Sequence, residues 1–486
     1  MLSILVCHSY FLRLDQKQIA RAKPYPPLAT LQVVSLLRKA GHRVAFFDAM
    51  LADGIEEYEG LLRNAEPQLV LFYEDNFNFL SKMCLAAMRQ AACDMIGSAR
   101  RSGARVIAAG PDVSDAPAPY LRAGADLTLV GEGLSALLEL LPKLDEQPEA
   151  SPETLVKGLS GVAFFSGGKV FNPSGSKSVP LVQEAGLAAW DLVDVQRYRD
   201  VWMKAHGYFS LNMAASRGCP FRCTWCAKPI WGNHYLQRTP SDVAAEMAYL
   251  KHAYNPGHIW FADDIFGFRV DWVTEFAAAA KAADAQIPFS IQTRADLISD
   301  RMARALRDAG CTEAWIGAES GSQKVLDAMN KGTTVAEILS ARERLKAVGI
   351  RVGFFIQLGY LDEQLEDILA TRDLLTAAQP DEIGVSVSYP LPGTKFYELV
   401  KSQLQGKTHW QESNDLDMMF HGTYTSDFYR AVRNLLHDQV TLQSDGMRAA
   451  SDERGRMQHA LYRRWEDLLS RELQYRSGPT RAALAG

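Results

Sequence analysis

Three cysteines within eight residues are the part of this sequence best suited to chemistry. Cys219, Cys223 and Cys226 have the spacing C-x-x-x-C-x-x-C. Cysteine thiolates are the usual ligands of iron–sulfur clusters, and a four-iron cluster held by only three of them leaves one iron open to a small molecule. A structural zinc site would need a fourth protein ligand, and His234 is the nearby candidate. The alternatives to an iron–sulfur cluster are a structural zinc site and unligated thiols.

The elements that must position these cysteines form a repeating pattern. Apolar stretches alternate about six times with amphipathic helical stretches such as Ser241–Ala253 and Val335–Val348. Six such units can close part of a barrel, with the chemistry at the carboxyl ends of the strands. The cysteines directly follow the first expected strand. The expected strands are Leu211–Arg217, His258–Asp264, Pro288–Asp296, Glu313–Ser320, Arg351–Gly359 and Glu382–Pro390.

The first 145 residues alternate in the same way and predict a separate α/β domain. Continuous apolar strands separated by helices indicate a parallel sheet covered on both faces, a Rossmann-like doubly wound sheet. Ligands of such sheets bind beyond the carboxyl ends of the strands, which here are polar or rich in glycine. The expected strands are Leu2–Cys7, Arg43–Ala49, Leu69–Glu74, Ala104–Gly110 and Leu127–Gly133, and the expected helices are Leu28–Ala40, Ser81–Arg100 and Leu134–Leu144.

The remaining segments complete a four-part division into residues 1–145, 146–205, 206–395 and 396–486. The second part is a connector without chemistry, with a hairpin and Gly-Gly turn expected within Gly161–Phe171. The last part is helical at Ser426–His437 and Gly455–Arg471. Before these helices, Trp410 and the aromatic and methionine-rich segment Asp415–Tyr424 form a candidate lid over the barrel.

Composition excludes several classes of partner. The net charge of −5 gives no electrostatic reason for a nucleic-acid partner. The apolar start Met1–His8 has no basic lead and is interpreted as a buried strand, and no apolar stretch approaches the roughly 20 residues that a membrane span requires. Seven cysteines, of which four are scattered among apolar neighbours, fit a reducing compartment. We therefore expect a cytoplasmic protein.

The cysteine segment, Ala215-Ser-Arg-Gly-Cys-Pro-Phe-Arg-Cys-Thr-Trp-Cys-Ala, closely resembles the radical S-adenosylmethionine (SAM) superfamily. An aromatic residue, Trp225, precedes its last cysteine, as in that superfamily. The resemblance implies a 4Fe-4S cluster held by the three cysteines, SAM chelating the open iron, and an external electron donor such as flavodoxin or ferredoxin.

SAM brings an amine and a carboxylate that need partners at the barrel mouth. Asp263 and Asp264 end the second expected strand and are candidates to accept hydrogen bonds from the amine; a simple helix cap by one of them is the alternative. Gln292 and Arg294 end the third strand. They are candidates for the SAM carboxylate or the substrate, since arginine binds carboxylates with two parallel hydrogen bonds.

The resemblance extends to the later strands. Glu319 and Ser320, in Ile316-Gly-Ala-Glu-Ser-Gly-Ser, match the position that contacts SAM in relatives and suit ribose hydroxyls. Gln357 on the fifth strand is expected to face the site. Ser388 lies at the end of the sixth strand, and Pro390 begins the proline-rich turn that closes the barrel against adenosine in relatives.

The first domain is similar to the cobalamin-binding domains that precede many radical SAM domains. The strings Gly110-Pro-Asp-Val-Ser, Leu121-Arg-Ala-Gly-Ala-Asp and Val130-Gly-Glu-Gly carry this likeness, although ordinary βα turns also favour these residues. The motif D-x-H-x-x-G is missing, and Asp112 stands where relatives commonly carry histidine. We therefore expect no imidazole on cobalt. The candidate corrin neighbours are Ser9, Tyr73, Glu74, Asn76, Gly110, Asp112, Gly131, Glu132 and Gly133.

The resemblance implies a cobalamin-dependent radical SAM enzyme. It would form a 5′-deoxyadenosyl radical, and the first hypothesis for its reaction is methylation of an unactivated carbon of a small-molecule substrate. The segments Leu358–Glu363 and Asp415–Tyr424 are similar to the branch of the anaerobic magnesium-protoporphyrin monomethyl ester cyclases and phosphinate methylases. Radical cyclisation or rearrangement of a tetrapyrrole-like substrate is therefore the first alternative. A non-catalytic cobalamin- or cluster-binding sensor is the second.

Overall fold

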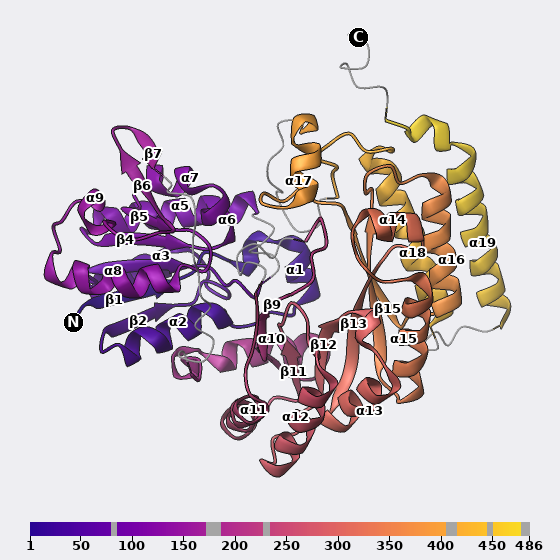
Figure 1. The fold of residues 1–486 in the computed structure, drawn as a ribbon, viewed down its shortest axis with the longest axis horizontal. Helices are drawn as coiled ribbons and strands as arrows, with labels where there is room; N and C mark the ends of the chain where they lie inside the picture. Colours follow the sequence, from indigo (N-terminus) through magenta and orange to yellow (C-terminus); the bar gives the residue numbers. More distant parts are fainter. Residues whose placement is uncertain (79–84, 172–185, 227–233, 405–415, 445–450, 478–486) are drawn as a thin grey trace, which may run out of the picture. The chain divides into compact units, whose positions relative to one another are not determined.

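The computed structural model describes residues 1–78, 85–171, 186–226, 234–404, 416–444 and 451–477 (Figure 1). Trp410, Asp415 and residues 81–84 of an expected helix lie outside these ranges. Contacts divide the chain into two compact units. Unit 1 comprises Met1–Pro220, Ala227–Asp264 and His409–Asp415, and unit 2 comprises Phe221–Cys226, Ile265–Thr408 and Leu416–Gly486. In the described ranges, no helix is both long and apolar enough to cross a membrane.

Unit 1 is built on a seven-stranded sheet with the order β2-β1-β3-β4-β5-β6-β7. Strands β1 to β5 pair in parallel, and β6 and β7 add antiparallel neighbours at one edge. The strands are β1 (Ser3–Cys7), β2 (Arg43–Phe47), β3 (Leu69–Tyr73), β4 (Arg105–Ala109), β5 (Leu127–Leu129), β6 (Val162–Ser166) and β7 (Lys169–Phe171). The first five begin within a residue of their predicted positions, and β5 ends four residues early, before the turn at Gly131.

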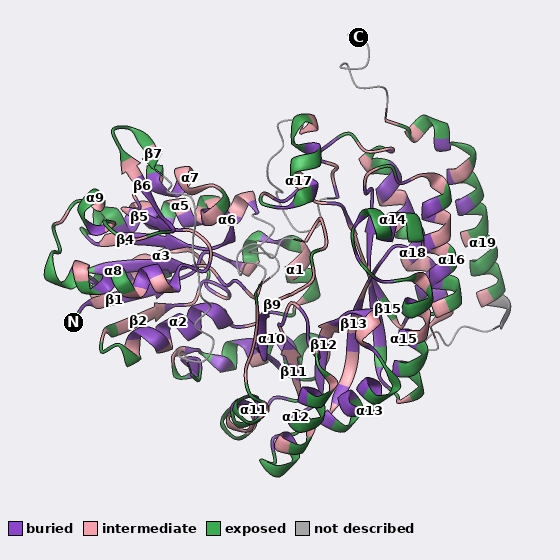
Figure 2. Cartoon of the chain, in the orientation of Figure 1, coloured by how far each residue is buried: buried purple, intermediate pink, exposed green. Residues whose placement is uncertain are grey.

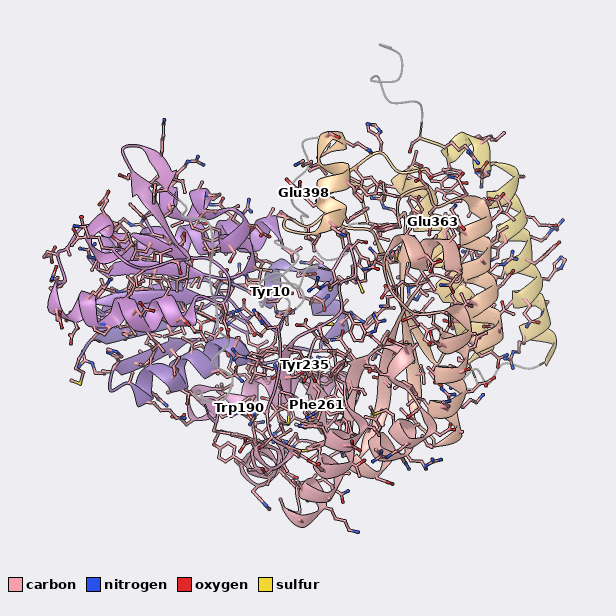
Figure 3. All side chains as sticks on the ribbon, viewed as in Figure 1. Tyr10, Trp190, Tyr235, Phe261, Glu363 and Glu398 are labelled. Carbon is pink, nitrogen blue, oxygen red and sulfur yellow. The ribbon has the colours of Figure 1, made fainter. Side chains whose placement is uncertain are left out.

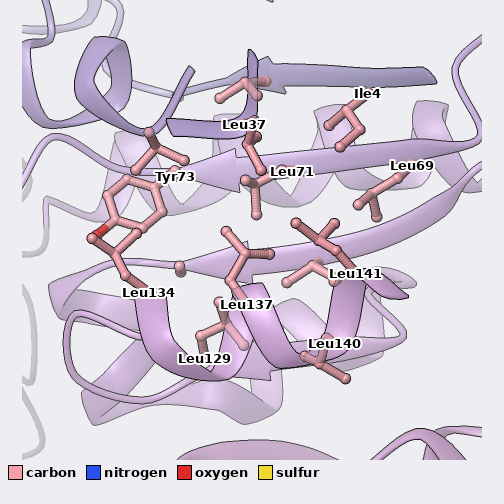
Figure 4. Close-up of a cluster of buried hydrophobic side chains, with 14 of the residues drawn as sticks. Ile4, Leu37, Leu69, Leu71, Tyr73, Leu129, Leu134, Leu137, Leu140 and Leu141 are labelled. Atoms are coloured by element: carbon pink, nitrogen blue, oxygen red, sulfur yellow. The ribbon is translucent and has the colours of Figure 1, made fainter. Parts of the chain in front are cut away.

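Each face of this sheet has its own hydrophobic core. Ile4 and Val6 of β1 pack into the core beneath α2 and α8, drawn in Figure 4, whereas Leu5 and Cys7 pack into the core beneath α3 and α5. This alternation within one strand is what a doubly covered parallel sheet requires. The helices of this part are α1 (Gln16–Arg21), α2 (Leu28–Lys39), α3 (Ile55–Ala65), α5 (Ala86–Arg101), α6 (Pro111–Asp115), α7 (Pro117–Ala123), α8 (Leu134–Glu146) and α9 (Pro152–Leu155).

The segment expected as a connector belongs to the same sheet. Its hairpin forms as predicted, with Gly167 and Gly168 both at positive φ (56° and 78°), which a tight two-residue turn demands. The sheet therefore continues beyond residue 145, because β6 pairs with β5. Helix α10 (Val195–His206) follows, and its Trp202 Nε1 donates to the carbonyl oxygen of Pro24 at 2.7 Å.

Unit 1 ends with the strands that lead to the cysteines. Strand β8 (Ser210–Met213) pairs in parallel with β11 (His258–Phe261), and β9 (Ser216–Gly218) pairs antiparallel with β10 (Tyr235–Gln237). Helix α11 (Pro240–Tyr254) lies between β10 and β11 in the chain. The single strand expected over Leu211–Arg217 is therefore wrong. The chain leaves the sheet after Met213 because Asp263 binds the N–H of Ala215 and the hydroxyl of Ser216.

Unit 2 continues the alternation with four parallel strands in the order β12-β13-β14-β15. They are β12 (Phe289–Thr293), β13 (Cys311–Glu319), β14 (Arg351–Leu358) and β15 (Glu382–Val387). The helices are α12 (Val270–Ala282), α13 (Asp300–Ala309), α14 (Gln323–Ala328), α15 (Val335–Ala347), α16 (Leu365–Ala378), α17 (Lys395–Val400), α18 (Ser426–Gln443) and α19 (Ser451–Ser470). Figure 2 shows buried and half-buried strands, and helices whose outer sides are exposed. The predicted α/β class is confirmed.

Candidate functional site

The second half of the cysteine segment is fixed to unit 2 by backbone hydrogen bonds. The N–H of Thr224 donates to the carbonyl of Met329 at 2.9 Å, and the carbonyl of Thr224 accepts from Phe396 at 3.0 Å. Trp225 packs against the hydrophobic core around Tyr360 and Phe396. These contacts hold Cys223 and Cys226, on either side of Thr224 and Trp225, as half-buried thiols.

Cys219 follows β9 directly and belongs to unit 1. Among the described residues, no three His, Cys, Asp or Glu side chains are grouped closely enough to hold a metal ion. The fit of this segment to an iron–sulfur cluster therefore rests on its chemistry. Three half-buried thiols at this spacing, with the Arg294 N–H donor beside Cys223, match what thiolate ligation needs.

Arg294 lies beside Cys223. Its Nη1 donates to the Cys223 Sγ at 3.7 Å, and its guanidinium carbon lies 3.7 Å from the centroid of the Phe221 ring. The other side of the guanidinium is bound to Asp296 and to the carbonyl of Lys331. Every one of these contacts lies on the polypeptide, so the side chain predicted to bind a carboxylate is engaged by the cysteine segment and its neighbours.

Glu319 forms a buried ion pair with Lys331. The Nζ of Lys331 lies 2.6 Å from the Glu319 Oε1, and both side chains are at most 7% exposed. Glu319 has a left-handed φ of 62°, which is uncommon outside glycine. A Cβ at Gly317 would stand 2.6 Å from both the Glu319 Oε1 and the Lys331 Nζ, so a side chain there would displace the ion pair. Burial lowers the pKa of Lys331, but the charges of Glu319 and Cys223 outweigh it and raise the pKa.

The other candidates of unit 2 are placed as follows. Gln357 donates to the hydroxyl of Ser388 at 3.1 Å, while its own Oε1 is buried and has no hydrogen-bond partner in the described ranges. Ser320 hydrogen-bonds Thr371 at 3.2 Å. Gln292 is half-buried, and its carbonyl accepts from Phe266, while Pro390 is buried.

In unit 1, Asp263 stabilises the segment before Cys219. It follows Phe261, which ends β11 and is labelled in Figure 3. Its carboxylate accepts from the Ser216 hydroxyl at 2.5 Å and from the Ala215 N–H at 3.0 Å. Burial raises the pKa of Asp263 to about 7, although these hydrogen bonds oppose the rise. Asp264 is half-buried.

The loops beyond β1, β3 and β4 meet at one end of the first sheet. Ser9 donates to the Glu74 Oε1 from its N–H at 3.0 Å and from its hydroxyl at 2.7 Å. A Cβ at Gly110 would lie 2.7 Å from the Glu74 Cβ, so only glycine fits there. Asp112 binds Arg89 and the hydroxyl of Tyr120, the latter at 2.7 Å.

The loop beyond β5 is tied to the strand before the cysteines. Glu132 and Arg217 form an ion pair with exposed side-chain fractions of 0% and 4%. The Tyr73 hydroxyl donates to the carbonyl of Glu132 at 2.9 Å, and Asn76 donates to that hydroxyl at 3.3 Å. Gly131 donates its N–H to the Ser114 hydroxyl at 3.0 Å.

Two buried oxygens at this end of the sheet, the Glu132 Oε2 and the Asn76 Oδ1, have no hydrogen-bond partner among the described residues. A Cβ at Gly133, where φ is 71°, would lie 2.6 Å from the Leu129 Cβ. The glycines and the unsatisfied acceptors thus coincide on the loops expected to meet a corrin. Sequence reasoning missed Arg217 and Lys331, and the only local signal for Arg217 is its place two residues before the first cysteine.

Comparisons with known proteins agree with this arrangement. Residues 213–375 match the radical SAM superfamily. An uncharacterized methyltransferase of Pyrococcus horikoshii is 25% identical over 402 residues, covering 81% of this chain and 82% of the relative. The anaerobic magnesium-protoporphyrin IX monomethyl ester cyclase of Cereibacter sphaeroides is 26% identical over 285 residues, covering 58% of this chain and 45% of the cyclase.

Among solved structures, the fold is similar to that of TsrM from Kitasatospora setae, a radical SAM methyltransferase with cobalamin and a [4Fe-4S] cluster bound. The TM-score is 0.65 at 18% identity, covering 83% of this chain and 75% of that one. The matched range contains the three cysteines, the candidate aspartates and the Arg294, Glu319 and Gln357 positions. Residues 213–375 of this chain are therefore a radical SAM domain.

Proposed function

We propose that this chain is a cobalamin-dependent radical SAM enzyme that methylates an unactivated carbon of a small molecule. The observation that carries the proposal is the radical SAM match over residues 213–375, which includes Cys219, Cys223 and Cys226. In such an enzyme the iron–sulfur cluster supplies the electron that cleaves SAM, and cobalamin supplies the methyl group.

The chain's own residues support the assignment of SAM. Within the part of the chain that the structure describes, the buried Oε1 of Gln357 accepts no hydrogen bond, and its Nε2 donates to the Ser388 hydroxyl. A buried acceptor without a partner is costly, and a ligand donor at that place would relieve the cost. An adenine amino group or a ribose hydroxyl are donors of this kind, so we assign Gln357 and Ser388 to the nucleoside of SAM.

The ends of β1, β3, β4 and β5 support a cobalamin site on the first sheet. Gly110 and Gly133 leave no room for side chains, and none of the described residues hydrogen-bonds the Asn76 Oδ1. His8 directly follows β1. Its side chain is 1% exposed, and its imidazole is hydrogen-bonded to Asp48 at 3.0 Å. The absence of a protein imidazole on cobalt remains our expectation from the missing D-x-H-x-x-G motif.

The test is cofactor loading of the purified chain. After anaerobic reconstitution with iron and sulfide, we expect about four irons per chain and the spectrum of a [4Fe-4S] cluster. After incubation with hydroxocobalamin and desalting, we expect cobalamin to be retained in a base-off form. A chain that assembles the cluster but retains no cobalamin would contradict the cobalamin part of the proposal. A chain that binds neither cofactor would contradict the whole proposal.

Cyclisation is the second candidate function, and the cyclase of Cereibacter sphaeroides favours it. This chain spans 45% of that cyclase, so the cyclase substrate is carried over only as a hypothesis. Product mass separates the two functions, because methylation adds one CH2 unit and cyclisation adds none. The finer assignments, a flavodoxin or ferredoxin as electron donor and a cytoplasmic location, complete the proposal.

A further inference from the structure

Arg294 is held in one orientation by contacts on every side. It follows β12 and is 6% exposed. Its Nε donates to Asp296 at 2.9 Å, its Nη2 donates to the Lys331 carbonyl at 2.6 Å and to the Thr333 hydroxyl at 2.9 Å, and its Nη1 donates to the Cys223 Sγ at 3.7 Å. A planar guanidinium fixed in this way cannot turn away from the thiol without losing several hydrogen bonds.

Phe221 adds a second link between this arginine and the cysteine segment. The guanidinium carbon stands 3.7 Å from the ring centroid, well within the range of a cation–π interaction. Phe221 and Cys223 are two positions apart in the sequence. One guanidinium therefore contacts two residues of the segment by two different interactions.

The charge of Arg294 is only partly compensated. Asp296 accepts from Nε and Nη2, and its side chain is 19% exposed, so water shares its charge. Lys331 brings a second cation, whose charge interacts with Cys223 but is paired with Glu319. Of these four side chains, Arg294 is the one whose N–H donates directly to the Cys223 sulfur.

We propose that Arg294 is a positioning residue that raises the reduction potential of a cluster bound through Cys223. Hydrogen bonds to the sulfurs and nearby charge are main determinants of cluster potentials. An N–H donor and a cation beside one thiolate stabilise the more negative, reduced cluster. The inference rests on the proposed cluster and assigns Arg294 to its sulfur ligand rather than to the SAM carboxylate.

The redox step balances with one electron. An external low-potential donor loses one electron, the cluster gains it, and no proton moves because the guanidinium stays protonated at all accessible pH values. No bond is made or broken at Arg294. Its effect is purely on the equilibrium between the oxidised and reduced cluster.

The test is a redox titration of the reconstituted full chain without cobalamin, using dithionite and mediators, with the reduced cluster followed by its EPR signal. Arg294→Gln should shift the equilibrium about tenfold against reduction, a fall of about 59 mV for a one-electron couple. Asp296→Asn, which removes the compensating negative charge, should shift the potential in the opposite direction. Opposite signs from two variants are not expected of residues that only support the fold.

Arg342→Gln is the matched control. Arg342 is another buried arginine of unit 2, ion-paired with Asp381 at 3.2 Å, and should leave the potential unchanged. A wild-type potential in Arg294→Gln, or a fall in Asp296→Asn, would overturn the inference. If Arg294→Gln fails to retain iron, the reduction potential of Asp296→Asn tests the inference instead, and it should rise. A wild-type chain that assembles no cluster would instead overturn the proposed function.

Discussion

Arg217 and Glu132 are 85 positions apart in the sequence and form a buried ion pair within unit 1. Glu132 lies in the loop between β5 and α8 of the first sheet, and Arg217 lies in β9, two residues before Cys219. Arg217 also binds Gln32 of α2 and lies 5.5 Å from the Phe77 ring centroid. A candidate cobalamin loop is thus bound directly to the strand that leads into the cysteines.

Breaking this pair should cost stability. Burial lowers the pKa of Arg217 to about 10, yet the group stays charged at neutral pH and Glu132→Gln would leave it without its counter-charge. We expect Glu132→Gln to reduce the free energy of unfolding by about 3–5 kcal/mol, measured by denaturant unfolding. The exposed pair Arg301–Asp271 is the control, and Asp271→Asn should cost at most about 1 kcal/mol. Equal costs for the two variants would contradict the buried pair.

Gly110 should be required for cobalamin binding. An alanine there would place its Cβ 2.7 Å from the Glu74 Cβ, at a φ of 151°. Glu74 must move, and Ser9, which hydrogen-bonds it, would move with it. We expect Gly110→Ala to lose most bound cobalamin after desalting, measured by absorbance. Gly103→Ala, also at positive φ but with open space around its Cβ, should retain it. Retention by both would argue against a corrin at this end of the sheet.

Because of Glu363, the free energy of unfolding should fall as the pH rises. It is fully buried in the loop after β14 and is labelled in Figure 3. Burial raises its pKa to about 8, while the Gly359 N–H that donates to its Oε2 opposes the rise. Because the folded pKa lies above the unfolded value of about 4.3, folding takes up a proton between these values. The contribution of the protonated Glu363 to the free energy of unfolding is fully present below pH 4 and is lost as the pH rises through about 8.

Glu363→Gln removes that titration. Between pH 6 and pH 9 the wild type should lose about 2–3 kcal/mol more of its unfolding free energy than the variant, measured by urea unfolding at both values. A parallel pH dependence of the two chains would show that Glu363 is not protonated in the folded protein at pH 6.

Substitution of individual cysteines should distinguish cluster ligands from cysteines that only pack in the core. Cys223→Ala should lose the reconstituted cluster and all reductive cleavage of SAM. Cys311, by contrast, is fully buried in β13, and its pKa is raised by burial, so it is a packing residue. Cys311→Ala should keep the cluster and lose only about 1 kcal/mol of stability. Full SAM cleavage by Cys223→Ala, measured as 5′-deoxyadenosine, would contradict the ligand assignment.

Local patterns predicted the repeating elements well, because each strand and helix carries its own hydrophobic periodicity. The break between β8 and β9 was missed, since it depends on Asp263, which lies about fifty positions beyond Ala215. The same limit applies to the site. Cysteine spacing is visible in the sequence, whereas the pairs Arg217–Glu132 and Lys331–Glu319 are set by tertiary packing. The sequence predicted Arg294 as a partner of the SAM carboxylate or the substrate, and its contact with Cys223 could not be read from its position in the chain.

The most direct test of the whole account follows two products in one reaction. The reconstituted chain is incubated anaerobically with SAM, hydroxocobalamin, a low-potential reductant and candidate small-molecule substrates, and 5′-deoxyadenosine and S-adenosylhomocysteine are measured together. The account predicts both products, with bound cobalamin and a substrate heavier by one CH2 unit. 5′-Deoxyadenosine alone would contradict methylation and favour cyclisation or rearrangement. If a chain with an intact cluster forms neither product, the non-catalytic sensor would be favoured.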